Sequence, residues 1–565
     1  MKKNNYNFVS KNRRPVENRK FVTGQGNFVA DIDRPNMLHV AILACHEPSA
    51  VIEKIDFSAA LKMKGVVDVI TGKELAEATK PLLNGLDTPN VKRYPLAFEQ
   101  VRYAGEWVCA IVAQSRAIAE DASEKILLKT TSLKFVLDSE EAILSKSPIV
   151  HKKHGSNILL EKQFVWGEVE NDFKKSNHKI SYKVNWGRNS TVPVETFGVV
   201  AEWNAWKNIL DIWASIQMPK FSEHIAFVLG LRANQVRVHY DVDVGGSYGV
   251  KRGIKHTILT SYISRKLHRP IRLIEDRLEN MRAGDAHGPE RKFDVSMAFD
   301  TDGKIHSMKM RALDNAGAYA GRAPFQLGKP IGAIVGPYTI SSVEYIAISV
   351  TTNKAVQEAV RGFGQAPTNY ALETGIDKIA NFLKMDRIKL RQKNLIKAKQ
   401  FPYIIPSGSE YDSGDYQTVI KKVFANKNYN ELIKERDSLR KKGLMAGIGI
   451  ASCLEPSGGN SSFEPLLNSK NKTTTWMESC QLNVDASGTV TVRIHTTSSG
   501  QGHETLVSTI VGEILEIDPN EICIARPNSI ESLPGNSPVG SRMAIMLGGA
   551  AGKAAKKIKE KIIKI

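Results

Sequence analysis

A glycine turn at residues 498–504, SSGQGHE, has the residue types and spacing of a ligand-binding segment. Its glycines, Gly500 and Gly502, allow a sharp bend and let a ligand approach the backbone closely. A helix beginning directly afterwards would present free amide groups to an anion, and Gln501 and His503 add polar side chains. We interpret this segment, called turn C, as a cradle for a phosphate-bearing cofactor, with a purely structural turn as the alternative.

Two further glycine turns occur earlier in the chain. Turn A, residues 245–251, reads GGSYGVK, after the expected strand VRVHYDVDV and before a helix. Its spacing is not that of Walker A, but the helix end still makes it an anion cradle. Turn B, residues 359–367, reads AVRGFGQAP and precedes an amphipathic helix. Its aromatic residue, Phe363, is either displayed to a ligand or folded into the core. Three such turns predict one large anionic ligand held between domains.

Other polar residues have plainer interpretations. Gln217 lies where a strand is expected to break, and capping of its own loop is the structural interpretation. His151 and His154 have a spacing that metal-binding helices use, but no third ligand stands nearby, so a solvated basic loop is predicted. Gly24 and Gly26 lack the third glycine of a dinucleotide fingerprint and are interpreted as a turn.

Hydrophobic periodicity predicts the elements that position these turns. Residues 490–494 alternate as in a strand with one buried face, and residues 506–517 have helical spacing before Pro519. Strands are also predicted for FVTGQGNFVADI, MLHVAILAC, GVVDVITG and WVCAIVAQS, and a helix within residues 113–128. A meander containing Asp302-Gly303 predicts hairpins. The fold class is therefore α/β (α+β).

Composition limits the classes of protein to which the chain can belong. The 565 residues carry 78 basic and 59 acidic side chains, a net charge of +19, with 42% hydrophobic residues. The basic excess is spread out and Lys-rich, without a nucleic-acid module, so we interpret it as solvated surface. No apolar run predicts a membrane span or a secretory signal. The five cysteines are scattered, which excludes a disulfide framework or iron–sulfur ligation and favours the cytoplasm.

The chain divides into compact blocks and connectors. The predicted divisions are a loose N-terminus at 1–18, an α/β domain at 19–138, a linker at 139–163, a second α/β block at 164–396, a charged connector at 397–444 and a final α/β block at 445–565. The last helix, GGAAGKAAKKIKEKIIKI, ends on its apolar stripe without a cap. We therefore expect the natural polypeptide or complex to continue beyond it.

In chain order, Gln217, GGSYGVK, AVRGFGQAP, GQGHET and GSRMAIMLGGAAGKAA resemble the large, molybdenum-binding subunit of the xanthine dehydrogenase/aldehyde oxidase/carbon monoxide dehydrogenase family, the molybdenum hydroxylases. RPVENRKFVTGQGNFVADI, GVVDVITG and YAGEWVCAIVA resemble that family's hammerhead domain. IRLIEDRLENM, TTNKAVQEAVRGFG and ALETGIDKIANFL resemble its first molybdenum-binding domain. The resemblance implies a hammerhead domain followed by two molybdopterin-binding domains, the last one incomplete.

The resemblance also implies a role for each motif. Gln217 matches the glutamine that hydrogen-bonds a molybdenum oxygen, and Phe363 the aromatic residue that stacks on substrates. The remaining matches are to residues that contact the cofactor: Gly245, Gly246, Ser247, Tyr248, Arg361, Gly500, Gln501, Gly502, His503, Ser541 and Arg542. The protein would give no direct ligand to the metal.

The implied cofactor is molybdopterin with molybdenum, in bacteria usually as the cytosine dinucleotide. The implied reaction oxidises an aldehyde or N-heterocycle with oxygen from water. Electrons would then pass to a 2Fe-2S small subunit and an FAD-binding medium subunit. Besides a small-molecule substrate, a separate chain carrying the C-terminal domain is a possible further partner; neither nucleic acid nor a membrane is expected.

Two departures from the family pattern bear on activity. The family's catalytic glutamate lies in a Gly-x-Gly-Glu segment that this sequence lacks; neither Glu106 nor Glu455 matches it. The chain alone is therefore expected to be inactive. Turn B has Gly362-Phe363-Gly364 where the carbon monoxide enzymes carry a copper-binding cysteine, which disfavours CO as substrate. The alternatives are a non-catalytic family member and a basic nucleic-acid-associated protein.

Overall fold

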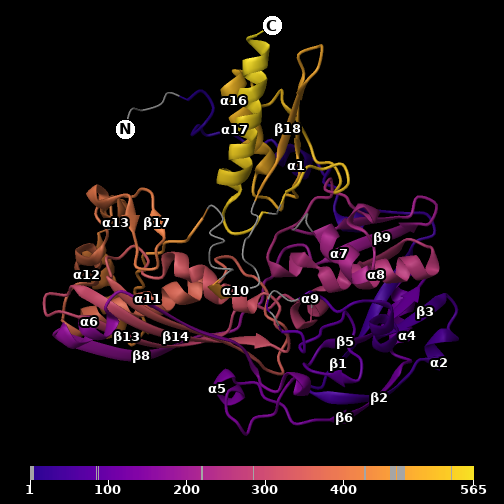
Figure 1. The fold of residues 1–565 in the computed structure, drawn as a ribbon, viewed down its shortest axis with the longest axis horizontal. Helices are drawn as coiled ribbons and strands as arrows, with labels where there is room; N and C mark the ends of the chain where they lie inside the picture. Colours follow the sequence, from indigo (N-terminus) through magenta and orange to yellow (C-terminus); the bar gives the residue numbers. More distant parts are fainter. Residues whose placement is uncertain are drawn as a thin grey trace.

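The computed structural model describes residues 6–83, 86, 88–217, 221–283, 285–425, 428–457, 466–467, 477–535 and 538–564. It has three bodies, each built around its own sheet (Figure 1). Two lie side by side, and a third, formed by residues 477–564 and here called the C-terminal body, stands above the junction between them. The predicted α/β (α+β) class is confirmed, because each body combines helices with its sheet.

A seven-stranded sheet spans the first two predicted blocks. Its strands, in spatial order, are β11 (Val236–Val238), β10 (Ile209–Ala214), β9 (Gly198–Asn204), β12 (Ile271–Ile274), β1 (Leu38–Cys45), β5 (Glu106–Ala113) and β3 (Val66–Thr71). The parallel pairing of β1 with β12 joins the N-terminal strands to those of the second block. Every residue of β5 is buried, as its unbroken apolar run predicts. Helix α4 (Arg116–Ser123) packs on β1, and α8 (Ile254–Leu267) packs on β9.

A five-stranded sheet forms the second body. Its order is β7 (Ile158–Trp166), β15 (Ser342–Thr351), β14 (Ile305–Gly317), β13 (Arg291–Phe299) and β8 (His178–Trp186). The predicted hairpin joins β13 to β14, and Gly303 takes a positive φ of 87° at its turn. Helix α11 (Gln365–Phe382), which follows turn B, packs against β13 and β8.

The C-terminal body has a separate hydrophobic core. Its strands β18 (Cys480–Val484), β19 (Val490–Ile494) and β20 (Cys523–Ala525) pack with α16 (His503–Leu515) and α17 (Met543–Ile562). The alternation and the helical spacing read from the sequence around turn C are thus confirmed. In the part of the chain that the structure describes, no helix is long and apolar enough to cross a membrane.

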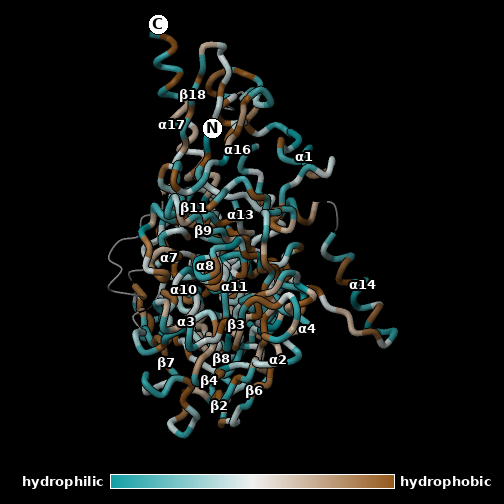
Figure 2. The backbone as a smooth tube through the Cα atoms, turned by 90° about the vertical axis from the view of Figure 1, so that its right-hand side faces the viewer, coloured by the Kyte–Doolittle hydropathy of each residue, from teal (hydrophilic) through white to brown (hydrophobic). Residues whose placement is uncertain are grey.

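The remaining elements are short or peripheral. The helices are α1 (Asn18–Val22), α2 (Ser58–Leu61), α3 (Gly72–Ala78), α5 (Ser139–Ala142), α6 (Val169–Lys175), α7 (Phe221–Leu229), α9 (Arg277–Ala283), α10 (Ala323–Gly328), α12 (Arg387–Asn394), α13 (Tyr416–Val423) and α14 (Tyr429–Lys441). The strands are β2 (Ala50–Asp56), β4 (Gln100–Val101), β6 (Leu127–Ser132), β16 (Tyr403–Ile404) and β17 (Glu410–Tyr411). Helix α14 projects from the molecule at one side (Figure 2).

The structure differs from the sequence-based expectation at three places. FVTGQGNFVADI forms the end of α1 and a 3-10 turn at Val29–Asp31, because its apolar residues stand in adjacent pairs separated by two glycines and do not alternate as in a strand. The charged connector contains α13 and α14, whose polar faces stay in water, so their apolar signal is weak. His151 is not solvated: it is buried, and its Nε2 lies 2.6 Å from the carbonyl oxygen of Ala318.

The described part of the predicted loose N-terminus runs along α16. The Glu513 carboxylate accepts hydrogen bonds from the backbone amides of Asn7, Phe8 and Val9 at 3.0, 2.6 and 3.0 Å. The amide of Val16 donates to the Thr505 hydroxyl at 2.9 Å. A polar segment without a core of its own can be ordered in this way by long-range hydrogen bonds that its sequence does not announce.

Candidate functional site

Turns A and B meet backbone to backbone. The amide of Gly249 donates to the carbonyl of Ala359 at 2.7 Å. A Cβ atom on Gly249 would lie 2.4 Å from the Ala359 nitrogen, so only glycine permits this approach. Two segments more than a hundred residues apart are therefore held at contact distance, as the prediction of a shared ligand requires.

Gln217 stands between turn A and the C-terminal body. It follows β10, and its backbone amide donates to the Lys251 carbonyl at 2.9 Å. Its side-chain Nε2 donates to the Pro538 carbonyl at 3.1 Å. The side-chain Oε1 is buried and has no hydrogen-bond partner among the described residues. An amide with one buried atom unsatisfied is expected where a ligand completes the contact.

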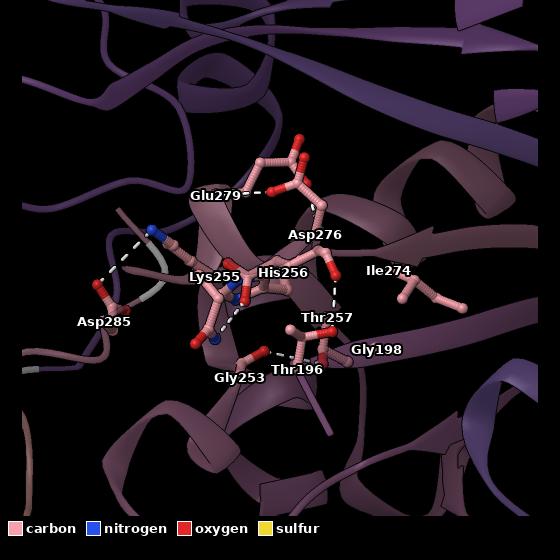
Figure 3. Close-up of polar contacts among 12 residues, drawn as sticks. Thr196, Gly198, Gly253, Lys255, His256, Thr257, Ile274, Asp276, Glu279 and Asp285 are labelled. Carbon is pink, nitrogen blue, oxygen red and sulfur yellow. Dashed lines mark hydrogen bonds and ion pairs between the residues drawn. The ribbon is translucent and has the colours of Figure 1, made fainter. Parts of the chain in front are cut away.

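The helix after turn A is fixed by buried polar contacts (Figure 3). Thr257 donates its hydroxyl to the Gly253 carbonyl at 2.9 Å, which holds the first turn of α8. Lys255 lies 3.6 Å from Asp285 and 4.1 Å from the centre of the Trp107 ring. These contacts anchor α8, and with it turn A, to the hammerhead strand β5, which carries Trp107.

Turn C opens the helix α16 as predicted. Gly500 and Gly502 have φ of 91° and 75°, a region that favours glycine. A Cβ atom on Gly500 would meet nothing within 4 Å, so its backbone borders open space. The Gln501 side chain accepts from the Ser499 amide at 2.6 Å, while the buried His503 ring places Nδ1 3.1 Å from the Thr497 carbonyl.

Polar atoms without partners gather beside turn C. His495 is 1% exposed, and neither ring nitrogen has a hydrogen-bond partner among the described residues. The hydroxyl oxygens of Thr497 and Ser499 are also buried and also lack a hydrogen-bond partner among the described residues. Burial, with a smaller effect of Arg493, lowers the pKa of His495 to about 4, so its ring is neutral. Such a group fits a ligand with several polar atoms. Sequence reasoning placed Ser499 in turn C but missed His495 and Thr497, although a histidine at the end of a strand before a glycine turn was a usable signal.

Asp243 joins turn A to turn C. Its carboxylate accepts from Lys20 at 2.5 Å, from the Asn27 amide at 3.0 Å and from Arg526 at 2.9 Å. Arg526 also places its Nε 3.4 Å from Glu504, the last residue of turn C. Burial alone would raise the pKa of Asp243, but these donors lower it below its ordinary value.

Glu504 and Glu17 form a carboxyl pair next to turn C. Glu17 accepts from the Thr505 amide at 3.1 Å and from the Thr505 hydroxyl. Burial and the adjacent Glu17 carboxyl raise the pKa of Glu504 to about 7, while the pKa of Glu17 is lowered. The pair therefore holds one proton between its two members near neutral pH.

Residues 538–542, called turn D, complete the arrangement. Ser541 has a φ of 53° and donates its hydroxyl to Glu455 at 3.3 Å. Glu455 in turn receives Lys329 at 2.5 Å, whose ammonium group also lies 3.4 Å from the Gly362 carbonyl of turn B. The buried Arg542 pairs with Glu478 at 2.6 Å.

The predicted site residues thus come from segments that are linked to one another. Turn A touches turn B, Gln217 touches turns A and D, and Asp243 links turn A to turn C. Arg361 is exposed, whereas Phe363 is half-buried with a φ of 47°. The ring of Phe363 packs partly against the core and lies 6.0 Å from the Arg322 guanidinium, so both predicted alternatives apply in part.

Three family models match the chain in order. The aldehyde oxidase and xanthine dehydrogenase a/b hammerhead domain matches residues 23–134, and two molybdopterin cofactor-binding domains match residues 150–395 and 422–565. The carbon monoxide dehydrogenase large chain of Hydrogenophaga pseudoflava is 30% identical over 97% of this chain and 70% of its own length. The chain belongs to the molybdenum hydroxylase large-subunit family. The predicted resemblance is confirmed.

Other members of the molybdenum hydroxylase family agree in sequence and in structure. The nicotine 6-hydroxylase large subunit of Paenarthrobacter nicotinovorans is 28% identical over 99% of this chain and 69% of its own length. The structure of quinoline 2-oxidoreductase from Pseudomonas putida 86 superposes with a TM-score of 0.91 at 28% identity, covering 99% of this chain and 71% of that one. CO dehydrogenase from Oligotropha carboxidovorans gives a TM-score of 0.88 at 28% identity, covering 98% and 71%.

The open backbone of turn C generates a prediction about cofactor loading. We expect Gly502→Val to lower the molybdenum content of the purified protein at least tenfold, because a branched side chain would occupy the approach path. Gly488→Val is the matched control, since Gly488 has a φ of 83° and open space but lies in the β18–β19 hairpin. Elemental analysis of both variants decides. Equal molybdenum in both would remove turn C from the cofactor site.

The carboxyl pair generates a prediction about pH. The folded state keeps a proton on Glu504 up to about pH 7, whereas the unfolded chain releases it near pH 4.5. Stability should therefore fall as the pH rises from 4.5 through 7. Thermal unfolding of the Glu504→Gln variant should lose part of this slope, while the exposed control Glu531→Gln keeps it. Parallel curves for parent and Glu504→Gln would show that the two carboxyls do not share a proton.

Proposed function

We propose that the protein is the molybdopterin-binding catalytic subunit of an enzyme that oxidises an aldehyde or an N-heterocycle with oxygen from water. The observation that carries the proposal is the convergence of turns A, B, C and D with Gln217, beside buried polar atoms that have no partner among the described residues. The cofactor would be molybdopterin, as its cytosine dinucleotide, and it would supply the two-electron redox chemistry.

The chain's own groups would bind and orient that cofactor. The first two amides of α16, those of His503 and Glu504, would face a phosphate group, whose negative charge the helix dipole favours, while the next amide, of Thr505, already donates to Glu17. Gly245, Gly246, Ser247 and Tyr248 of turn A would contact the cofactor through their backbone groups, and the Gln217 side-chain amide, whose Oε1 has no partner among the described residues, would add one preorganised hydrogen bond to it. Gln501 and His503 shape turn C. Ser541 links turn D through Glu455 and Lys329 to turn B, and Arg542 pairs with Glu478.

Phe363 and the neighbouring residues of turn B would border the substrate. A half-buried aromatic ring can stack on a flat substrate, which favours aldehydes of aromatic compounds and N-heterocycles. Turn B carries no cysteine, which disfavours CO. The relatives nicotine 6-hydroxylase and quinoline 2-oxidoreductase are named for N-heterocycles. Electrons would leave through a 2Fe-2S subunit and an FAD subunit, in an enzyme located in the cytoplasm.

The Gln217 assignment can be tested by substitution. Gln217→Ala should keep the bound molybdenum but lower kcat by about 10²–10³-fold, as expected for loss of one preorganised hydrogen-bonding group. The measurement is turnover per molybdenum atom in the complete complex, in which the electron-transfer subunits are joined by a chain that carries the C-terminal domain. Gln163→Ala, an exposed glutamine on β7, is the control. A kcat unchanged in Gln217→Ala would remove Gln217 from the reaction site.

The general base is the second point to test. It must reach its proton within about 3 Å or through one water, and no Gly-x-Gly-Glu segment occurs in the 565 residues. We propose that these residues do not suffice for turnover, which leaves a non-catalytic family member as the alternative function. The 565-residue chain, loaded with cofactor and joined by electron-transfer subunits, should show no substrate oxidation. Activity comparable to that of other family members would show that another residue serves as base.

A further inference from the structure

A polar cavity borders turns A and B at the interface between the hammerhead domain and the first molybdopterin-binding domain. Its walls bring together side chains from both domains and backbone from turn A. The lining residues that carry the argument are Arg93, His224, Gly249, Arg252, Asp285 and Glu358. Gly249 makes the contact with turn B, and Glu358 immediately precedes that turn. A molecule in this cavity would therefore lie against the proposed site.

Arg252 is the central charged group of the cavity. Its Nη1 lies 3.1 and 3.2 Å from the two carboxylate oxygens of Glu358. Its Nε is buried and has no hydrogen-bond partner among the described residues. The guanidinium group carries five N–H donors, so the single contact with Glu358 does not use its capacity to bind an anion.

The other wall groups leave the cavity short of negative charge. Asp285 is engaged by Arg93 at 2.5 Å, and Lys255 lies 3.6 Å from the same carboxylate. Glu358 is engaged by Arg252, and burial raises the pKa of Glu358. The lining cations, Arg93, Arg252 and Lys255, therefore outnumber the lining carboxylates, Asp285 and Glu358.

His224 adds a neutral donor to this wall. The amide of Leu83 donates to the His224 Nε2 at 3.0 Å, which places the ring proton on Nδ1. Burial, with the nearby Arg252 and Arg322, lowers the pKa of His224 to about 3, so the ring stays neutral at ordinary pH. Because the His224 ring is neutral, it adds no positive charge to the wall. The charge excess therefore suits one anionic group rather than several.

We propose that this cavity receives a carboxylate of the substrate, bound by Arg252, so that the enzyme prefers aromatic substrates that carry a carboxylate on their ring. The proposal rests on the proposed function of the same site. A guanidinium group binds a carboxylate through parallel N–H donors, and pairing in a partly desolvated cavity strengthens that contact relative to water. The purely structural alternative is that Arg252 only ties turn A to Glu358.

The test compares two substrates that differ only in charge, 4-formylbenzoate and 4-formylbenzamide, with the complete enzyme complex. The parent enzyme should show the higher kcat/KM on the carboxylate. In Arg252→Met the ratio of kcat/KM between the carboxylate and the amide should fall at least tenfold, mainly through KM, and Arg252→Lys should restore part of it. Arg311→Met, on the five-stranded sheet, is the control and should leave the ratio unchanged.

Two results would overturn the proposal. The parent enzyme could show no preference for the carboxylate. Alternatively, Arg252→Met could lower kcat/KM equally on both substrates, as loss of a structural ion pair would. Calorimetric titration with benzoate and benzamide separates failure of the anion site from failure of the proposed function. If neither aldehyde is oxidised but benzoate binds the parent complex and not Arg252→Met, the anion site stands and the reaction was misassigned. If benzoate and benzamide bind both proteins alike, the anion site does not exist.

Discussion

The Asp243 carboxylate is the contact on which the arrangement of the three bodies depends. It lies two residues before turn A and accepts donors from the N-terminal segment and from Arg526 of the C-terminal body. It is 3% exposed, so the loss of one donor would leave a buried negative charge poorly compensated. Through Arg526 it also fixes Glu504, and hence the end of turn C. Asp243 is thus one of the contacts that set the position of turn C relative to turn A.

The C-terminal body is attached to the rest of the molecule by polar contacts rather than by a shared apolar core. Its core is separate, and its links to the other bodies run through Arg526, Ser529 and the N-terminal segment. Interfaces of this polar kind permit relative motion of domains. A cofactor that contacts turns A and C together would add a further link and would stabilise the assembled state by mass action.

Local patterns predicted most of the fold and the glycine turns, because strand alternation and helical spacing are properties of neighbouring residues. The strands around β5 and the helix after turn C followed from them. Local patterns did not predict which distant residues these elements contact. No local pattern shows that Glu17 meets Glu504, or that Asp243 meets Arg526, since each contact joins distant segments. FVTGQGNFVADI misled because it is rich in strand-forming residues, although these stand in adjacent pairs on either side of two glycines. Helices α13 and α14 were missed because charged faces masked their apolar stripes.

The buried polar atoms without partners around turn C explain why His495 and Thr497 escaped prediction and why they matter. A buried polar group without a partner costs about 1–3 kcal/mol, and His495, Thr497 and Ser499 stand together in that condition among the described residues. A chain would not retain such a cluster for its own stability, because apolar residues of similar size would pack better there. The cluster is consistent with a site shaped for a bound polar group, whose hydrogen bonds would recover the energy lost in its absence. The same reasoning applies to the Gln217 Oε1, which is also buried without a partner among the described residues.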